Sequence, residues 1–232
     1  MTLRPAGAYF VTVAARARAP LAACAAGLFF LIGSYAYPRN EPGGTYGMTA
    51  LIGTVLAAWL VRSVLGAEPA EQADMAAVAL GGRTQRLRLV AGLGACLAAI
   101  LAVVFVLYPL VLLWAGDTHV FDPHPRVADV VAAVAAHVAC LTFGATLGLL
   151  FAPPRVPGAP TAFAALTVTL LVVLVAGSAL GPVGGPYAVA DRMADARPGA
   201  ISAGELVADA SCLVLAAVAF GVADRWGRSR GG

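Results

Sequence analysis

Among the ionisable residues inside otherwise apolar stretches, three are the strongest candidates for chemistry. His137 lies near the middle of one stretch, Asp129 lies about two turns earlier on a nearby helical face, and Asp209 lies about one turn into the last stretch. Such groups in membrane spans usually face a bundle interior or an aqueous cavity, where they relay protons or line a transport path. Hydration or helix capping also explains the two aspartates, and a hydrogen bond to a neighbouring helix also explains the histidine.

Other kinds of catalytic or metal site are missing from the sequence. The chain has no lysine, so it has no Walker A phosphate-binding loop, which needs that residue. Neither the HExxH pattern of zinc proteases nor the GxSxG nucleophile turn occurs. Four cysteines lie inside apolar stretches without a CxxC pair, which is typical of small hydrophobic residues rather than metal ligands: Cys24, Cys96, Cys140 and Cys212. We therefore expect neither a metal nor a catalytic centre on this chain.

The elements that must position these residues are long apolar helices. Of the 232 residues 60% are hydrophobic and only 12% are charged, against about a quarter charged in soluble proteins. Six apolar stretches are each near or above the ~18–20 residues that cross a bilayer core: 20–37, 47–67, 89–115, 127–151, 161–183 and 206–223. The sequence predicts an all-α, polytopic membrane domain of six spans over residues 20–223, with polar ends at 1–19 and 224–232.

The distribution of arginine predicts the orientation of these spans. With both termini placed in the cytoplasm, eleven of the 15 arginines lie on the inner side and four on the outer side. This excess follows the positive-inside rule. A multi-pass protein of the plasma membrane with both termini cytoplasmic is therefore expected, and the alanine-rich composition suggests a bacterium. The net charge of +3 is too small to indicate a nucleic-acid partner.

Two short helices are expected on the inner side. The segment 9–18 carries an apolar face with an aromatic edge and a basic edge, which favours a helix lying in the membrane interface over a frayed tail. In the first inner loop, residues 70–80 are rich in helix formers and Gly81-Gly82 supplies a stop. A helix this short is marginal in water, so it is expected to lean on the membrane surface or on another protein. On the outer side, residues 184–204 are expected to form a small capping structure or a surface loop.

The layout resembles the permease subunits of type-two ATP-binding-cassette exporters. These share six spans, an interfacial helix before the first span, a short helix in the first inner loop and an enlarged outer segment between spans five and six. The stretch AAWLVRSVLGAEPAEQ (57–72), followed by ALGGR (79–83), is particularly similar to small actinobacterial members. The resemblance in layout extends over the whole chain, whereas the similarity in sequence is confined to residues 57–88.

The resemblance implies a homodimer, or a pair with a related permease, bound to two separately encoded ATPases that carry ATP and Mg²⁺. The helix after Glu68 would be the coupling helix that sits in a groove of the ATPase. Five residues would make this contact with the ATPase or hold the helix in position for it: Glu68, Glu71, Gln72, Met75 and Arg83. Ordinary solvated loop charges are the alternative for these residues.

Four functions remain open from the sequence. The first is an exporter permease for a hydrophobic or amphipathic substrate such as a peptide, lipid, natural product or drug. The second is a non-catalytic membrane scaffold or regulatory subunit. The third is an intramembrane enzyme that uses His137 with Asp129 or Asp209. The fourth is a self-sufficient ion-coupled carrier, although neither an internal repeat nor a broken helix typical of carriers is visible.

Overall fold

The computed structural model describes residues 3–36, 41–116, 120–122, 124–153, 156, 158–180, 184–195 and 203–229. Of the residues that the structure describes, 86% are helical. Its helices follow one another along the chain as α1 (Leu3–Arg16), α2 (Arg18–Ser34), α3 (Pro42–Leu65), α4 (Ala70–Ala79), α5 (Arg83–Trp114), α6 (Val127–Leu150), α7 (Ala159–Leu180), α8 (Pro186–Ala194) and α9 (Ala203–Ser229).

Among the residues that the structure describes, five helices are long and apolar enough to cross a membrane, and there is a sixth span if one bent pair is counted as one. The five are α3, α5, α6, α7 and α9. The bent pair is α1 with α2, whose axes differ by 73° at Ala17. The sequence places this bend where an interfacial helix meets the first span, and the helix beyond it, α2, has 17 residues. The prediction of a polytopic helical protein is therefore confirmed, while the exact number of spans stays a prediction.

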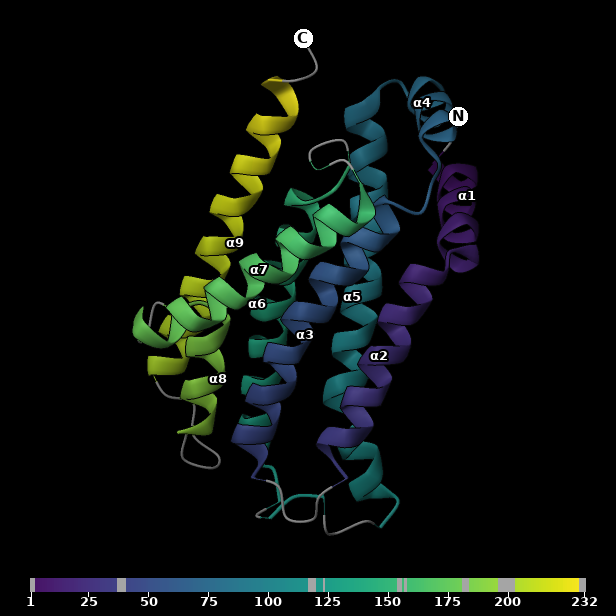
Figure 1. Ribbon diagram of the computed structural model, residues 1–232. Coiled ribbons are helices and arrows are strands. Elements are labelled where there is room, and N and C mark those ends of the chain that lie inside the picture. The colour runs from purple at the N-terminus through teal and green to yellow at the C-terminus, as the bar shows by residue number, and fades with distance from the viewer. Residues whose placement is uncertain are drawn as a thin grey trace.

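The centre of the bundle is α3, which packs against α2, α5, α6 and α8. Its contact with α6 is the most extensive, because Gly144 and Gly148 bring the backbone of α6 against the carbonyl groups of Thr54 and Ala58. Glycines spaced four residues apart allow this close approach between membrane helices. By contrast, α7 crosses the bundle obliquely and leaves most of its surface exposed (Figure 1). Its Phe163 packs against Trp59 of α3, with ring centroids 5.6 Å apart.

The helix α8 lies within the outer segment expected to form a cap or loop. It buries Pro186, Ala188, Val189 and Met193, and it packs closely on the beginning of α3 at Gly43 and Gly47. These contacts favour the capping structure for 186–195, while residues 196–202 lie outside the described residues.

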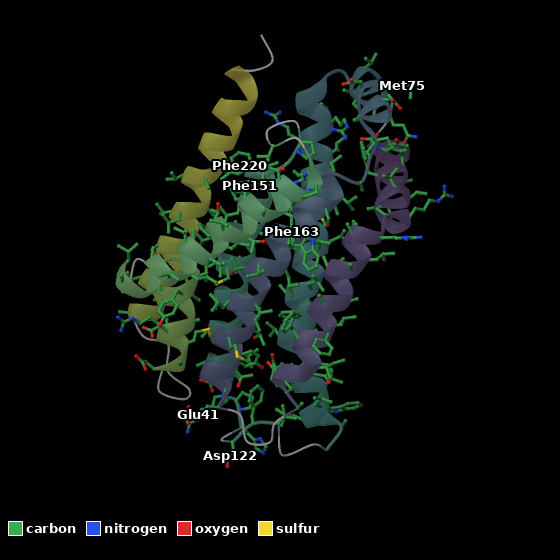
Figure 2. The ribbon with its side chains drawn as sticks, viewed as in Figure 1. Glu41, Met75, Asp122, Phe151, Phe163 and Phe220 are labelled. Carbon is green, nitrogen blue, oxygen red and sulfur yellow. The ribbon has the colours of Figure 1, made fainter. Side chains whose placement is uncertain are left out.

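The two ends of the bundle differ in what they carry. The start of α1, the end of α9 and α4 lie at one end, whereas the connections from α2 to α3 and from α5 to α6 lie at the other (Figure 1). Figure 2 shows the acidic residues Glu41 and Asp122 at the end opposite Met75 of α4. The start of α1 and the end of α9 lie at the same end of the bundle, which agrees with an even number of membrane crossings. We call the end that carries α4 the α4 end.

Candidate functional site: the α4 segment and a buried histidine

The helix α4 is built by residues that begin and end helices. Pro69 stands in extended backbone just before the helix, and Glu71 lies in its first turn, where a negative charge complements the helix dipole. At the other end Gly81 and Gly82 have φ of 86° and 142°, and the Gly82 N–H donates to the carbonyl of Ala77 at 2.8 Å. Positive φ is costly for other residues, so the glycines end the helix where the sequence predicts.

One face of α4 is apolar and turned away from the rest of the chain. Met75 is 65% exposed and Val78 is 83% exposed, while Ala77 on the opposite face is buried. Glu71, Met75 and Val78 are spaced by four and three residues, so they share one side of the helix. We call these three residues the α4 face. Exposed apolar side chains gathered on one side of a helix are typical of a surface that contacts another protein or the membrane.

Glu68 holds this segment in place from within the chain. Its Oε2 accepts a hydrogen bond from Arg86 Nε at 2.7 Å and a second from the Arg86 Nη2 group, and its Oε1 accepts one from the Tyr9 hydroxyl at 2.8 Å. The Glu68 and Arg86 side chains are only 3% and 11% exposed. Burial and the Glu68 carboxylate raise the pKa of the Tyr9 phenol, which keeps it a donor. One carboxylate thus ties together α1, the start of α4 and the first turn of α5.

The other sequence-predicted coupling residues are placed differently. Gln72 is exposed, and its Oε1 lies 3.5 Å from the Tyr9 hydroxyl, a long and weak contact. Arg83 begins α5, and its side chain lies outside the described part. Glu68 therefore positions the segment from inside, whereas Glu71 and Met75 are available to a partner.

Glu68→Gln is expected to loosen the α4 segment. The change leaves the Arg86 guanidinium nearly buried without a counter-ion, and breaking such a pair costs about 3–5 kcal/mol. Amide hydrogen exchange over residues 67–82 should become markedly faster than in the unchanged chain. Glu71→Gln is the matched control, because its side chain is exposed, and it should leave exchange unchanged. Equal exchange in the two variants would contradict the role of Glu68.

His137 lies at the centre of the bundle, fully buried between α6 and α3. Its Nδ1 lies 2.7 Å from the carbonyl oxygen of Ala133, so Nδ1 carries a proton and donates it. Its Nε2 lies 3.3 Å from the Thr49 hydroxyl of α3, and the rings of Tyr46 and Phe105 stand edge-on around it. Both ring nitrogens therefore have partners within the chain. This geometry favours the interhelical hydrogen bond among the roles expected for His137.

The two aspartates lie apart from this histidine. Asp129 lies in the first turn of α6, where its Oδ2 accepts a hydrogen bond from the Arg126 backbone N–H at 2.7 Å, which is a capping role. Asp209 is half-buried on α9. Within the described residues the three side chains share no hydrogen bond, and no group of three His, Cys, Asp or Glu residues could hold a metal ion.

His137→Leu is expected to change stability more than activity. The substitution removes the contact with Thr49 but keeps a buried side chain of comparable size, and such interhelical hydrogen bonds contribute about 0.6 kcal/mol on average. We expect a small decrease in melting temperature and an activity within a few-fold of the unchanged chain. Complete loss of activity in a variant that stays folded would instead favour the enzyme hypothesis.

Sequence reasoning missed three residues of these sites, namely Tyr9, Arg86 and Thr49. Tyr9 and Arg86 are 59 and 18 residues from Glu68 along the chain, so only the fold brings them together. The available signal was weak: a lone tyrosine on the expected interfacial helix, and one of three arginines after the double glycine.

The chain was compared with protein-family models, with curated proteins and with solved structures, and no match was found. The class of protein is therefore defined by its own fold. It is a polytopic α-helical membrane protein, and the described part of the chain holds five or six apolar helices that could span a bilayer. At one end it presents a short helix with an exposed apolar face.

Proposed function

We propose that this chain is the transmembrane permease subunit of an ATP-binding-cassette exporter. The ATP would be hydrolysed by a separately encoded ATPase, and the cargo would be a hydrophobic or amphipathic substrate. The single observation that carries the proposal is the α4 face, an exposed apolar ridge on a helix fastened to the bundle. Apolar side chains that a loop outside the membrane exposes to water raise the free energy of the protein unless another surface covers them.

The connections of α4 favour a mechanical role for it. The helix α5 runs without a break for 32 residues from Arg83 to Trp114, through the apolar zone. The Glu68–Arg86 pair ties the start of α4 to the first turn of this helix. A partner that pushed α4 would therefore move α5 with it. Such a movement needs a partner that binds the two states of the permease with different affinity, as an ATPase would before and after ATP hydrolysis.

Two further observations support the proposal. The chain has no lysine and so no Walker A loop of its own, which fits a division of labour with a nucleotide-binding partner. Eleven of the 15 arginines lie in the segments assigned to the side of α4, which under the positive-inside rule favours a cytoplasmic location for this end. In this arrangement the chain works in the bacterial plasma membrane with both termini cytoplasmic, as a homodimer or paired with a related permease.

A membrane scaffold or regulatory subunit is the second candidate, and the same α4 face favours it. Such a protein would also bind a partner through α4, but no substrate would cross the bundle. The two candidates differ in whether a substrate is transported, which the following experiment measures.

The test is co-purification followed by reconstitution. A tagged chain isolated from its own membranes should carry a P-loop ATPase, and the complex in liposomes should hydrolyse ATP faster when substrate is present. An ATPase that binds without any transport would favour the scaffold. Transport by the isolated chain alone would contradict the proposal.

A further inference from the structure

A long groove runs along the surface between α5 and α6. Its volume is about 630 Å³, within the range of ligand-binding sites. Along α5 its lining extends from Arg88 to Leu107, which corresponds to about 28 Å at 1.5 Å per residue and so to most of a bilayer core. Small residues of α5, such as Gly92, Ala95 and Ala99, form its floor, and a Cβ added at Gly92 would meet open space.

The polar groups along the groove are satisfied within the chain, with one exception. The hydroxyls of Thr142 and Thr146 donate to the carbonyls of Val138 and Thr142 at 2.6 and 2.8 Å, and His137 has the partners described above. These residues therefore present an apolar wall. Arg88 is exposed at the α4 end of the groove, and it has no hydrogen bond or ion pair with any residue that the structure describes.

We propose that this groove binds an anionic phospholipid of the membrane leaflet at the α4 end. An acyl chain fills the apolar channel between α5 and α6, and the phosphate pairs with Arg88. Basic pockets between membrane helices on the cytoplasmic side recognise phospholipid headgroups in this way. Among the described residues that line the groove none is acidic, so its charge is complementary to a phosphate.

The charge at Arg88 also decides against a second copy of the chain as the occupant. The small residues of α5 would accept a helix, as they do between many membrane helices. In a two-fold dimer whose axis runs along the membrane normal, however, Arg88 of each copy would lie at the same depth and near its counterpart. Two guanidinium groups held close together would repel each other, whereas a phosphate neutralises one.

The experiment is native mass spectrometry of the full chain in neutral detergent. The chain is titrated with phosphatidylglycerol or phosphatidylcholine that carry the same acyl chains. We expect a several-fold preference for phosphatidylglycerol, because the choline cation of phosphatidylcholine would lie beside the Arg88 guanidinium and oppose the pairing of its phosphate with this residue. In Arg88→Gln the preference should fall to near one. Ala95→Trp, which fills the groove from an exposed position, should weaken the binding of both lipids.

Arg16→Gln is the matched control, since Arg16 is exposed near the same end but outside the groove, and it should keep the preference. Equal binding of the two lipids by the unchanged chain would overturn the proposal, as would equal losses in Arg16→Gln and Arg88→Gln. Lipid binding that survives Ala95→Trp while a dimer dissociates would also overturn it, because the groove would then hold a second copy. None of these outcomes depends on whether an ATPase binds α4.

Discussion

Replacing Met75 and Val78 together with aspartate is expected to abolish the association of this chain with the ATPase proposed as its partner, and any export that depends on that association. Both side chains are largely exposed in the isolated chain, so the change should not disturb folding. At an interface each would bury apolar surface worth about 1.5–3 kcal/mol, so losing both should weaken binding about 100-fold or more. Two buried carboxylates without counter-ions would weaken it further. Pull-down of the ATPase and transport by the reconstituted complex measure the effect.

The control for this variant keeps the apolar surface and changes only its shape. Met75→Leu with Val78→Ile should retain association and export within a few-fold. A double aspartate variant that binds the ATPase and exports normally would contradict this prediction. The α4 face would then be exposed to solvent and would contact no partner.

The second large effect is expected in the packing of α3 against α6. Gly144→Leu places a side chain where the carbonyl oxygen of Thr54 already lies, and this obstacle belongs to the backbone. Adding atoms to a well-packed core lowers the free energy of unfolding by about 1–3 kcal/mol. The loss here should reach or exceed the upper end of that range, because a backbone carbonyl cannot rotate away as a side chain can. We expect loss of the monodisperse peak in size-exclusion chromatography and a strong decrease in folded yield.

Gly33→Leu is the matched control for Gly144→Leu. Gly33 lies in α2, and a Cβ added there meets no atom within 4 Å. The same substitution at this position should leave yield and elution unchanged. Folded protein at normal yield from Gly144→Leu would mean that α3 and α6 do not pack as described.

Much of the fold could be predicted from the sequence because the signals are local. Runs of about 18 or more apolar residues predict helices that can cross a bilayer, and α3, α5, α6, α7 and α9 lie where those runs lie. Gly81 and Gly82 indicate the end of α4 through a backbone requirement that no other residue meets easily. The 73° bend between α1 and α2 follows a change from a basic, amphipathic segment to an apolar one.

The candidate site was less predictable because its contacts join distant parts of the chain. The sequence identifies Glu68 as a polar residue before a proline, and nothing local shows that its carboxylate is buried against Tyr9 and Arg86. The same is true of His137, whose partner Thr49 is 88 residues away. The groove between α5 and α6 depends on how two helices face each other, and the hydropathy pattern does not contain that information.

The most direct measurement is photo-cross-linking from position 78 in the membranes of the source cells. Val78 is 83% exposed, so a photoreactive side chain there should be tolerated and should touch whatever covers α4. The account predicts one major adduct, and mass spectrometry should identify it as a protein with a Walker A loop. Adducts only with lipid, or with proteins that lack this loop, would contradict the claim that an ATPase docks on α4.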